Sequence, residues 1–232
     1  IINLMKKLII LTFILIFSQP LWALSSSSFL ISQSAFKNHD YDLTLFNFDQ
    51  DGDKLSSKNL LDKVIAAIII EDLNLANNIS NNILINDPDN QEAYIVKLVY
   101  LYFNKKFDKI KKLHQNSTED NKLINFIFFN ESDLKDNVTI SNAIIDIVIS
   151  SFNNTDQQSL NYNFLLFYTS LAKIIDNSND RATLIKGELF QSIKKSKQSK
   201  IIFEMIKPSS PYYYDAQINL AINYSNFFPY EG

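Results

Sequence analysis

The chain has 232 residues, with 25 Asp and Glu against 22 Lys and Arg, a formal net charge of −3 and no cysteine. This weakly acidic balance argues against nucleic acid as a partner, since nucleic-acid-binding domains are typically strongly basic. The absence of cysteine excludes disulfides, cysteine nucleophiles, thiolate metal sites and a lipid-modified cysteine. Three glycines and five prolines are few for a sandwich or barrel with many tight turns, so the composition favours helices.

The N-terminal segment has the pattern of a secretory signal. Two lysines follow Met5, an apolar run covers residues 8–17, and residues 18–23 have the character of a cleavage region. Residues 1–4 precede the first methionine and are interpreted as an upstream artefact. The apolar run is shorter than the roughly 20 residues that span a bilayer. We therefore expect residues 1–23 to be a signal peptide that directs periplasmic location or export, with an uncleaved anchor as the alternative.

The next part of the chain predicts two helical hairpins. Residues 29–36 and 41–48 have the spacing of two short helices joined by a polar turn. Residues 49–57 form a polar loop whose last serines can cap a helix. This helix is predicted over residues 59–70, and its partner over residues 73–85.

The stretch from Asn86 to Tyr94 ends one helix and begins another. Pro88 cannot continue a helix and disfavours helical backbone in the residue before it. Either Asp89 or Asn90 can cap the next helix, and a glutamate three residues after Asp89 predicts a capping box.

The helices on either side of this junction differ in their apolar patterns. The first has one apolar face and the second is apolar almost all round, as shown by Leu75, Ala76, Ile79 and Ile83 before the junction and by Ala93, Tyr94, Val96, Leu98, Val99, Leu101 and Tyr102 after it. We expect the first helix on a surface and the second between neighbours. A hairpin that cannot bury its own apolar face needs similar neighbours, which predicts a stacked helical repeat.

The rest of the chain continues the helical pattern. Helices are predicted over residues 91–104, 107–113, 123–129, 140–152, 157–175, 181–194, 197–206 and 213–226. The segments 123–129 and 140–152 are rich in β-branched residues, so strands are the alternative there. We favour helices because Ile140, Ile144 and Ile147 keep helical spacing.

A small residue followed by an aromatic residue recurs near the C-terminus, since Gly187 and Phe190 are matched later by Ala221 and Tyr224. Both members of the pair recur at the same interval, which is the tetratricopeptide period of about 34 residues. The chain resembles the tetratricopeptide repeat family. The positions that carry the resemblance are Ala76, Pro88, Tyr94, Gly187, Phe190, Ser199, Phe203, Pro211, Leu220, Ala221 and Tyr224.

The resemblance implies an all-α fold, a right-handed solenoid of helical hairpins over residues 24–232. The two prolines at repeat junctions, Pro88 and Pro211, are not separated by a whole number of these periods. We therefore expect degenerate repeats in the middle. The last helix lacks a partner before Gly232, and we expect the natural protein to continue beyond this residue.

The resemblance also implies that a protein or peptide partner binds along the concave face of the solenoid. Carried over by position, this face holds Glu92, Val99 and Tyr102 in one unit, Arg181, Glu188 and Gln191 in another, and Asn219, Ile222 and Asn226 in the last. The alternative is that Val96 and Val99 belong to the core and that the polar residues are ordinary solvated side chains.

Other candidate sites are weaker. Asn47, Asp49 and Asp51 imitate the start of a calcium loop, but Lys58 stands where the bidentate glutamate is required. Basic runs over residues 105–112 and 194–200 are interpreted as solvated helix faces. The two histidines, His39 and His114, have no second ligand at metal spacing. We therefore expect no metal site and no cofactor.

The leading hypothesis is a non-catalytic scaffold of the bacterial periplasm or envelope that binds another protein. The first alternative is the helical accessory region of a larger exported enzyme that acts on cell-wall polymers. The second is a solenoid held at the membrane by an uncleaved signal. The sequence contains no glycine-rich phosphate loop, no Gly-x-Ser-x-Gly elbow and no His-Glu-x-x-His pattern.

Overall fold

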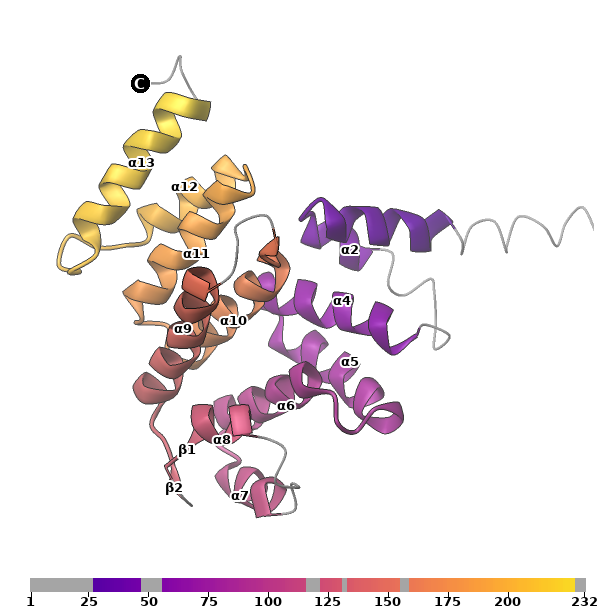
Figure 1. Ribbon diagram of the computed structural model, residues 1–232. Coiled ribbons are helices and arrows are strands. Elements are labelled where there is room, and N and C mark those ends of the chain that lie inside the picture. Colours follow the sequence, from indigo (N-terminus) through magenta and orange to yellow (C-terminus); the bar gives the residue numbers. More distant parts are fainter. Residues whose placement is uncertain (1–26, 47–55, 116–121, 131–132, 155–158, 228–232) are drawn as a thin grey trace, which may run out of the picture.

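The computed structural model describes residues 27–46, 56–115, 122–130, 133–154 and 159–227, and these are mostly helical (Figure 1). A helix over residues 27–37 precedes α2 (Tyr41–Phe46), α4 (Ser57–Ile69), α5 (Leu73–Asn86), α6 (Gln91–Phe103), α7 (Phe107–Gln115), α8 (Lys122–Phe128), α9 (Asn137–Asn154), α10 (Tyr162–Ile175), α11 (Asp180–Ser192), α12 (Ser196–Glu204) and α13 (Tyr213–Phe227). The prediction of an all-α fold is confirmed. The predicted signal peptide and most of the calcium-like loop lie outside the described residues.

Short polar side chains begin several of these helices. The side chains of Ser56, Asp72, Asn90, Asn161 and Asn179 each accept a hydrogen bond from a backbone N–H three residues later. At the junction before α6, Asn90 Oδ1 accepts from the Ala93 amide at 3.1 Å. The capping box that begins at Asp89 was therefore wrong, because Asn90 satisfies the free amide of the first turn.

Four hairpin turns contain a residue with left-handed backbone. His39, Glu71, Lys105 and Lys194 have φ between 55° and 66°. In each turn the next residue donates its backbone N–H to a carbonyl five positions earlier, as Asp72 does to Ala67 at 2.8 Å. This is the Schellman closure of a helix C-terminus, in which glycine is the usual left-handed residue.

Three hairpins share one register. In each, the left-handed residue of the turn lies the same number of residues after the N-cap of the first helix. The N-caps are residues 56, 90 and 179, and the corresponding left-handed residues are 71, 105 and 194. The first two of these caps also lie one tetratricopeptide period apart, about 34 residues. The local chemistry of cap and turn therefore repeats once at this interval, from the first of these hairpins to the second, and glycine stands in none of the three turns.

The middle of the chain is helical with one exception. The helix predicted over residues 123–129 ends at Phe128, and Phe129 begins β1 (Phe129–Asn130), which pairs with antiparallel β2 (Asp133–Leu134). The helix predicted over residues 140–152 is confirmed as α9. The helix predicted from residue 157 begins instead at Tyr162, because Asn161 caps it.

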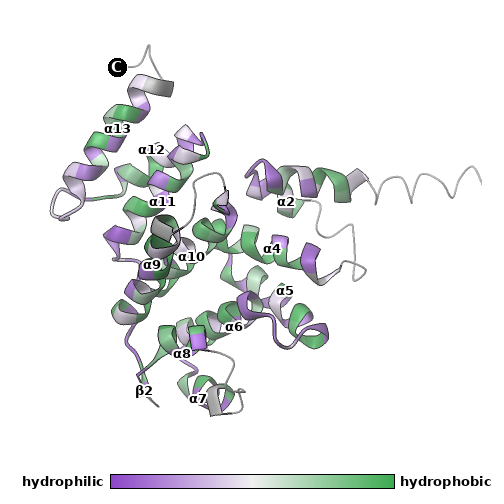
Figure 2. Cartoon of the chain, in the orientation of Figure 1, coloured by the Kyte–Doolittle hydropathy of each residue, from purple (hydrophilic) through white to green (hydrophobic). Residues whose placement is uncertain are grey.

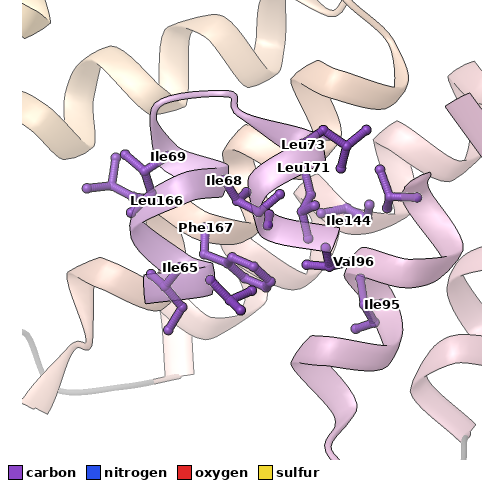
Figure 3. Packing of buried hydrophobic residues seen from close by; sticks show 14 of the residues in the cluster. Ile65, Ile68, Ile69, Leu73, Ile95, Val96, Ile144, Leu166, Phe167 and Leu171 are labelled. Atoms are coloured by element: carbon purple, nitrogen blue, oxygen red, sulfur yellow. The ribbon is translucent and has the colours of Figure 1, made fainter. Parts of the chain in front are cut away.

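Helix α10 lies at the centre of the structure. It packs on α9 and α11, its neighbours in sequence, and also on α4 and α6, which lie far earlier in the chain. Figure 3 shows Phe167 of α10 beside Ile65 of α4, with Val96 of α6 and Leu171 close by. The hydrophobic colour in Figure 2 runs along α4, α6 and α10. One large core cluster accordingly extends from Phe36 to Phe190.

The last helices have a smaller core of their own. Leu184, Phe203, Ile206, Ala216 and Leu220 form a separate cluster of buried side chains from α11, α12, α13 and the turn after α12. Helices α11 and α12 form a hairpin, and α13 packs on both (Figure 1). Within the described residues, none of the helices has both the length and the apolarity that a membrane span requires.

Candidate functional site

The predicted binding residues of α6 are buried or half-buried. Val99 is fully buried, so its prediction as a partner-binding residue was wrong and the alternative of a core residue is correct. Tyr102 is half-buried, and its hydroxyl donates to the carbonyl of Lys135 at 3.3 Å. Glu92 lies near Tyr168 of α10, whose pKa is raised mainly by burial and also by this carboxylate. Helix α10, which packs on α6, and Lys135, which contacts Tyr102, thus occupy part of the surface that a partner would need.

Three predicted binding residues meet where α11 packs against α13. Asn219 Nδ2 donates to Glu188 Oε1 at 3.2 Å, and Gln191 Nε2 donates to the carbonyl of Asn219 at 3.3 Å. Burial raises the pKa of Glu188, the hydrogen bond from Asn219 lowers it, and Asp215 raises it. The three polar side chains are therefore engaged in helix pairing.

The remaining predicted binding residues lie nearer the surface. Arg181 Nη1 is 3.0 Å from Asp146 Oδ1 of α9, in an ion pair that solvent reaches. Ile222 is 44% exposed on α13. The side chain of Asn226 lies outside the described residues.

The repeat positions taken from the resemblance divide into groups by burial. Ala76, Gly187, Phe190, Ser199, Phe203 and Leu220 are buried, Tyr94 and Tyr224 are half-buried, and Pro88, Pro211 and Ala221 are exposed or nearly so. Gly187 lies directly against the ring of Phe203, so a side chain at this position would collide with it. Ala221, its counterpart one period later, is exposed.

A pocket of about 280 Å³ lies where the first hairpin meets α11 and α12. Its lining comes from the turn after the first helix, the start of α2, the end of α4, and α11 and α12: His39, Asp40, Tyr41, Asp42, Ile69, Ile70, Lys186, Phe190, Lys195, Gln198, Ile201 and Ile202. Ile69 and Phe190 are buried, whereas Ile70 and Ile201 are 39% and 55% exposed. Apolar side chains thus line the pocket from buried positions to the surface.

Charged groups of both signs stand among these apolar side chains. Asp40 and Asp42 come from the turn and the first turn of α2, and both are exposed. Lys195 and Gln198 come from the start of α12 and its first turns. Such a combination of apolar lining and a few polar groups is typical of ligand and peptide sites.

Two internal contacts hold the pocket together. Lys186 is buried, and its Nζ donates to Glu71 Oε1 at 2.7 Å and to the carbonyl of Ile69 at 3.3 Å, which ties α11 to the end of α4. The hydroxyl of Tyr41 donates to Asn163 Oδ1 of α10 at 2.8 Å. Burial raises the pKa of Tyr41 above its usual value.

Sequence reasoning did not find this pocket. Its residues come from three segments that lie apart in the chain, residues 39–42, residues 69–70 and residues 186–202, and only the fold brings them together. The one local signal was Lys186, a lysine in the middle of an otherwise buried helix face. A charged residue at such a position indicates a specific partner, here Glu71 and the end of α4.

The comparisons with known proteins give no relative. No protein-family model matches the chain. Searches of curated proteins and of solved structures find no match either. Across the part of the chain that is described, no three His, Asp or Glu side chains gather in a group that could hold a metal ion.

Proposed function

We propose that this chain is a non-catalytic, tetratricopeptide-like scaffold of the bacterial periplasm or envelope that binds a segment of another protein. The observation that carries the proposal is the pocket between the first hairpin and α12. Its lining combines two exposed isoleucines, Ile70 and Ile201, with the buried side chains of Ile69 and Phe190. A partner's apolar side chain removed from water in this pocket supplies binding energy, at about 25 cal/mol per Å² of apolar surface.

The shared register of three hairpins supports a tetratricopeptide-like arrangement. Two of these hairpins are also followed by a proline at the same position. Pro88 comes as many residues after the N-cap Ser56 as Pro211 comes after the N-cap Asn179. The arrangement differs from an open solenoid in the position of α10, which occupies the side of α4 and α6. The proposed binding surface is therefore the pocket rather than a continuous inner face.

The charges around the pocket favour a polar chain segment with one apolar anchor over a purely apolar ligand. Asp40 and Asp42 can receive the amides or a basic side chain of such a segment, and Lys195 can receive a carbonyl or carboxylate. The buried Lys186 is already paired with Glu71, so its charge serves the fold. These features support binding without any covalent step.

Export is part of the proposal. The basic and apolar segment over residues 1–23 has the sequence of a secretory signal. N-terminal sequencing of the protein recovered from a periplasmic extract should begin near Leu24. An intact N-terminus in the membrane fraction would instead favour the anchored form.

The binding site is tested with a photo-crosslinking amino acid at Ile201, which should capture a partner from an envelope extract. The purified partner is then titrated against three forms of the chain: wild type, Ile201→Asp and Ile85→Asp. Ile85 is an exposed isoleucine of α5 outside the pocket, so it provides a matched control for the added charge.

We expect Ile201→Asp to weaken binding at least about tenfold, since even part of the burial energy of an isoleucine reaches about 1.4 kcal/mol. Ile85→Asp should bind like the wild type. Equal affinities of the two variants would contradict the proposed site. Turnover of a cell-wall polymer by the purified chain would contradict a non-catalytic scaffold.

A further inference from the structure

Helix α13 carries a stripe of large apolar side chains on its outer side. Tyr214, Ile218 and Ile222 are 79%, 59% and 44% exposed, and they follow one another at every fourth position. This spacing places all three on one face of the helix. Figure 1 shows α13 at one end of the molecule, where its inner side meets α11 and α12.

The equivalent face of α11 is already covered. Leu184 of α11 is the counterpart of Ile218 of α13 one repeat period earlier. The same interval separates Gly187 from Ala221, and it separates the N-cap Ser56 from the N-cap Asn90. Leu184 is only 8% exposed, and its cluster includes Ala216 and Leu220 of α13. Helix α11 thus buries this face under α13, whereas α13 leaves its equivalent face exposed. An element that continues the same packing would be another helix.

The charge on α13 favours a helix of the same kind as the occupant. Asp215 is the single Asp, Glu, Lys or Arg among residues 213–227. An apolar, nearly uncharged stripe offers no ion pair to a foreign partner and little repulsion to a second copy. Lys200 of α12 lies over the ring of Tyr224, 4.7 Å from its centroid, and Tyr224 packs on the inner cluster rather than in the stripe.

The stripe is also symmetric about its middle residue. If two α13 helices meet antiparallel with Ile218 opposite Ile218, Tyr214 of one copy lies opposite Ile222 of the other. The two Asp215 carboxylates are then about 9 Å apart along the helix axis, from a rise of about 1.5 Å per residue. At this separation, close to the Debye length of about 10 Å in 0.1 M salt, their repulsion is weak.

We propose that α13 is a self-association surface, at which two copies of this chain pair antiparallel about a two-fold axis near Ile218. Such an isologous contact lets the same patch of both copies cover each other. A single helix stripe buries less than the roughly 800 Å² per partner of a standard interface. The dimer is therefore in equilibrium with the monomer and depends on protein concentration.

Sedimentation velocity over a wide range of concentration tests the pairing. The wild type should pass from monomer to dimer as its concentration rises. Ile218→Asp should weaken the dimer about 100-fold or more, because each copy loses a buried isoleucine and gains a charge on the axis. Gln217→Asp adds the same charge about 100° around the helix, off the stripe, and should dimerise like the wild type.

A second measurement locates the axis. The chain has no cysteine, so Ile218→Cys introduces a single thiol. Under mild oxidation it should form a disulfide-linked dimer much faster than Gln217→Cys, since only a residue on the axis meets its own copy. A wild type that stays monomeric, an Ile218→Asp variant that still dimerises, or equal crosslinking of the two cysteines would overturn the proposal. Capture of a different protein at residue 218 with the chain monomeric would overturn it as well.

Discussion

At the scale of single residues, Gly187 packs tightly against the ring of Phe203. A Cβ added to Gly187 would lie 2.7 Å from Cδ1 of this fully buried ring, well inside van der Waals contact. We expect Gly187→Ala to lower the free energy of unfolding by up to about 2 kcal/mol. Overpacking costs roughly 1–3 kcal/mol, and the better helix propensity of alanine, about 1 kcal/mol, offsets part of it. Urea denaturation measures the change.

The partner of this contact provides the control. Phe203→Leu removes the ring that the new methyl group would meet. In the Phe203→Leu background, Gly187→Ala should be neutral or stabilising, and a double-mutant cycle would give a coupling well above the usual error of additivity, about 0.5 kcal/mol. Additive effects would show that the ring is not what limits the size of residue 187.

At the scale of elements, the left-handed residues of the hairpin turns carry backbone strain that a substitution by glycine can relieve. Lys105 has φ 55° in the turn between α6 and α7, and its side chain is exposed. Left-handed backbone costs a residue with a Cβ roughly 1–2 kcal/mol, whereas glycine adopts it readily. We therefore expect Lys105→Gly to raise the free energy of unfolding by about 0.5–1 kcal/mol. This net gain already subtracts the entropic cost of glycine, which makes the unfolded state more flexible. Thermal and urea unfolding both measure this gain.

Lys109 offers a matched control in the next helix. It is an exposed lysine inside α7, so Lys109→Gly removes the same charge without a left-handed backbone to favour glycine. This variant should lose about 1 kcal/mol because glycine is a poor helix former. A loss of stability in both variants would mean that the turn gains nothing from glycine.

At the scale of the whole molecule, local chemistry was easier to predict than packing. The break at Pro88 and the sandwiched character of α6 follow from residues within one turn of each other, and both are present. The helix that packs on α6 could not be predicted in this way, because a helix that is apolar all round does not indicate which neighbour covers it. Val99 was placed on an open face for this reason, whereas α10, much later in the chain, packs on this helix. The pocket escaped prediction because Asp40 and Ile201 become neighbours only through tertiary packing.

The position of α10 leads to the last prediction. In a solenoid whose repeats contact only their neighbours, a change in α10 affects α9 and α11. Here Phe167 of α10 is fully buried beside Ile65 of α4, so Phe167→Leu should also increase amide hydrogen exchange in α4 and α6. Phe203→Leu makes the same change in the smaller cluster, and its increase should stay within α11, α12 and α13. If Phe167→Leu left exchange in α4 unchanged, the chain would behave as a linear array rather than as one core closed by α10.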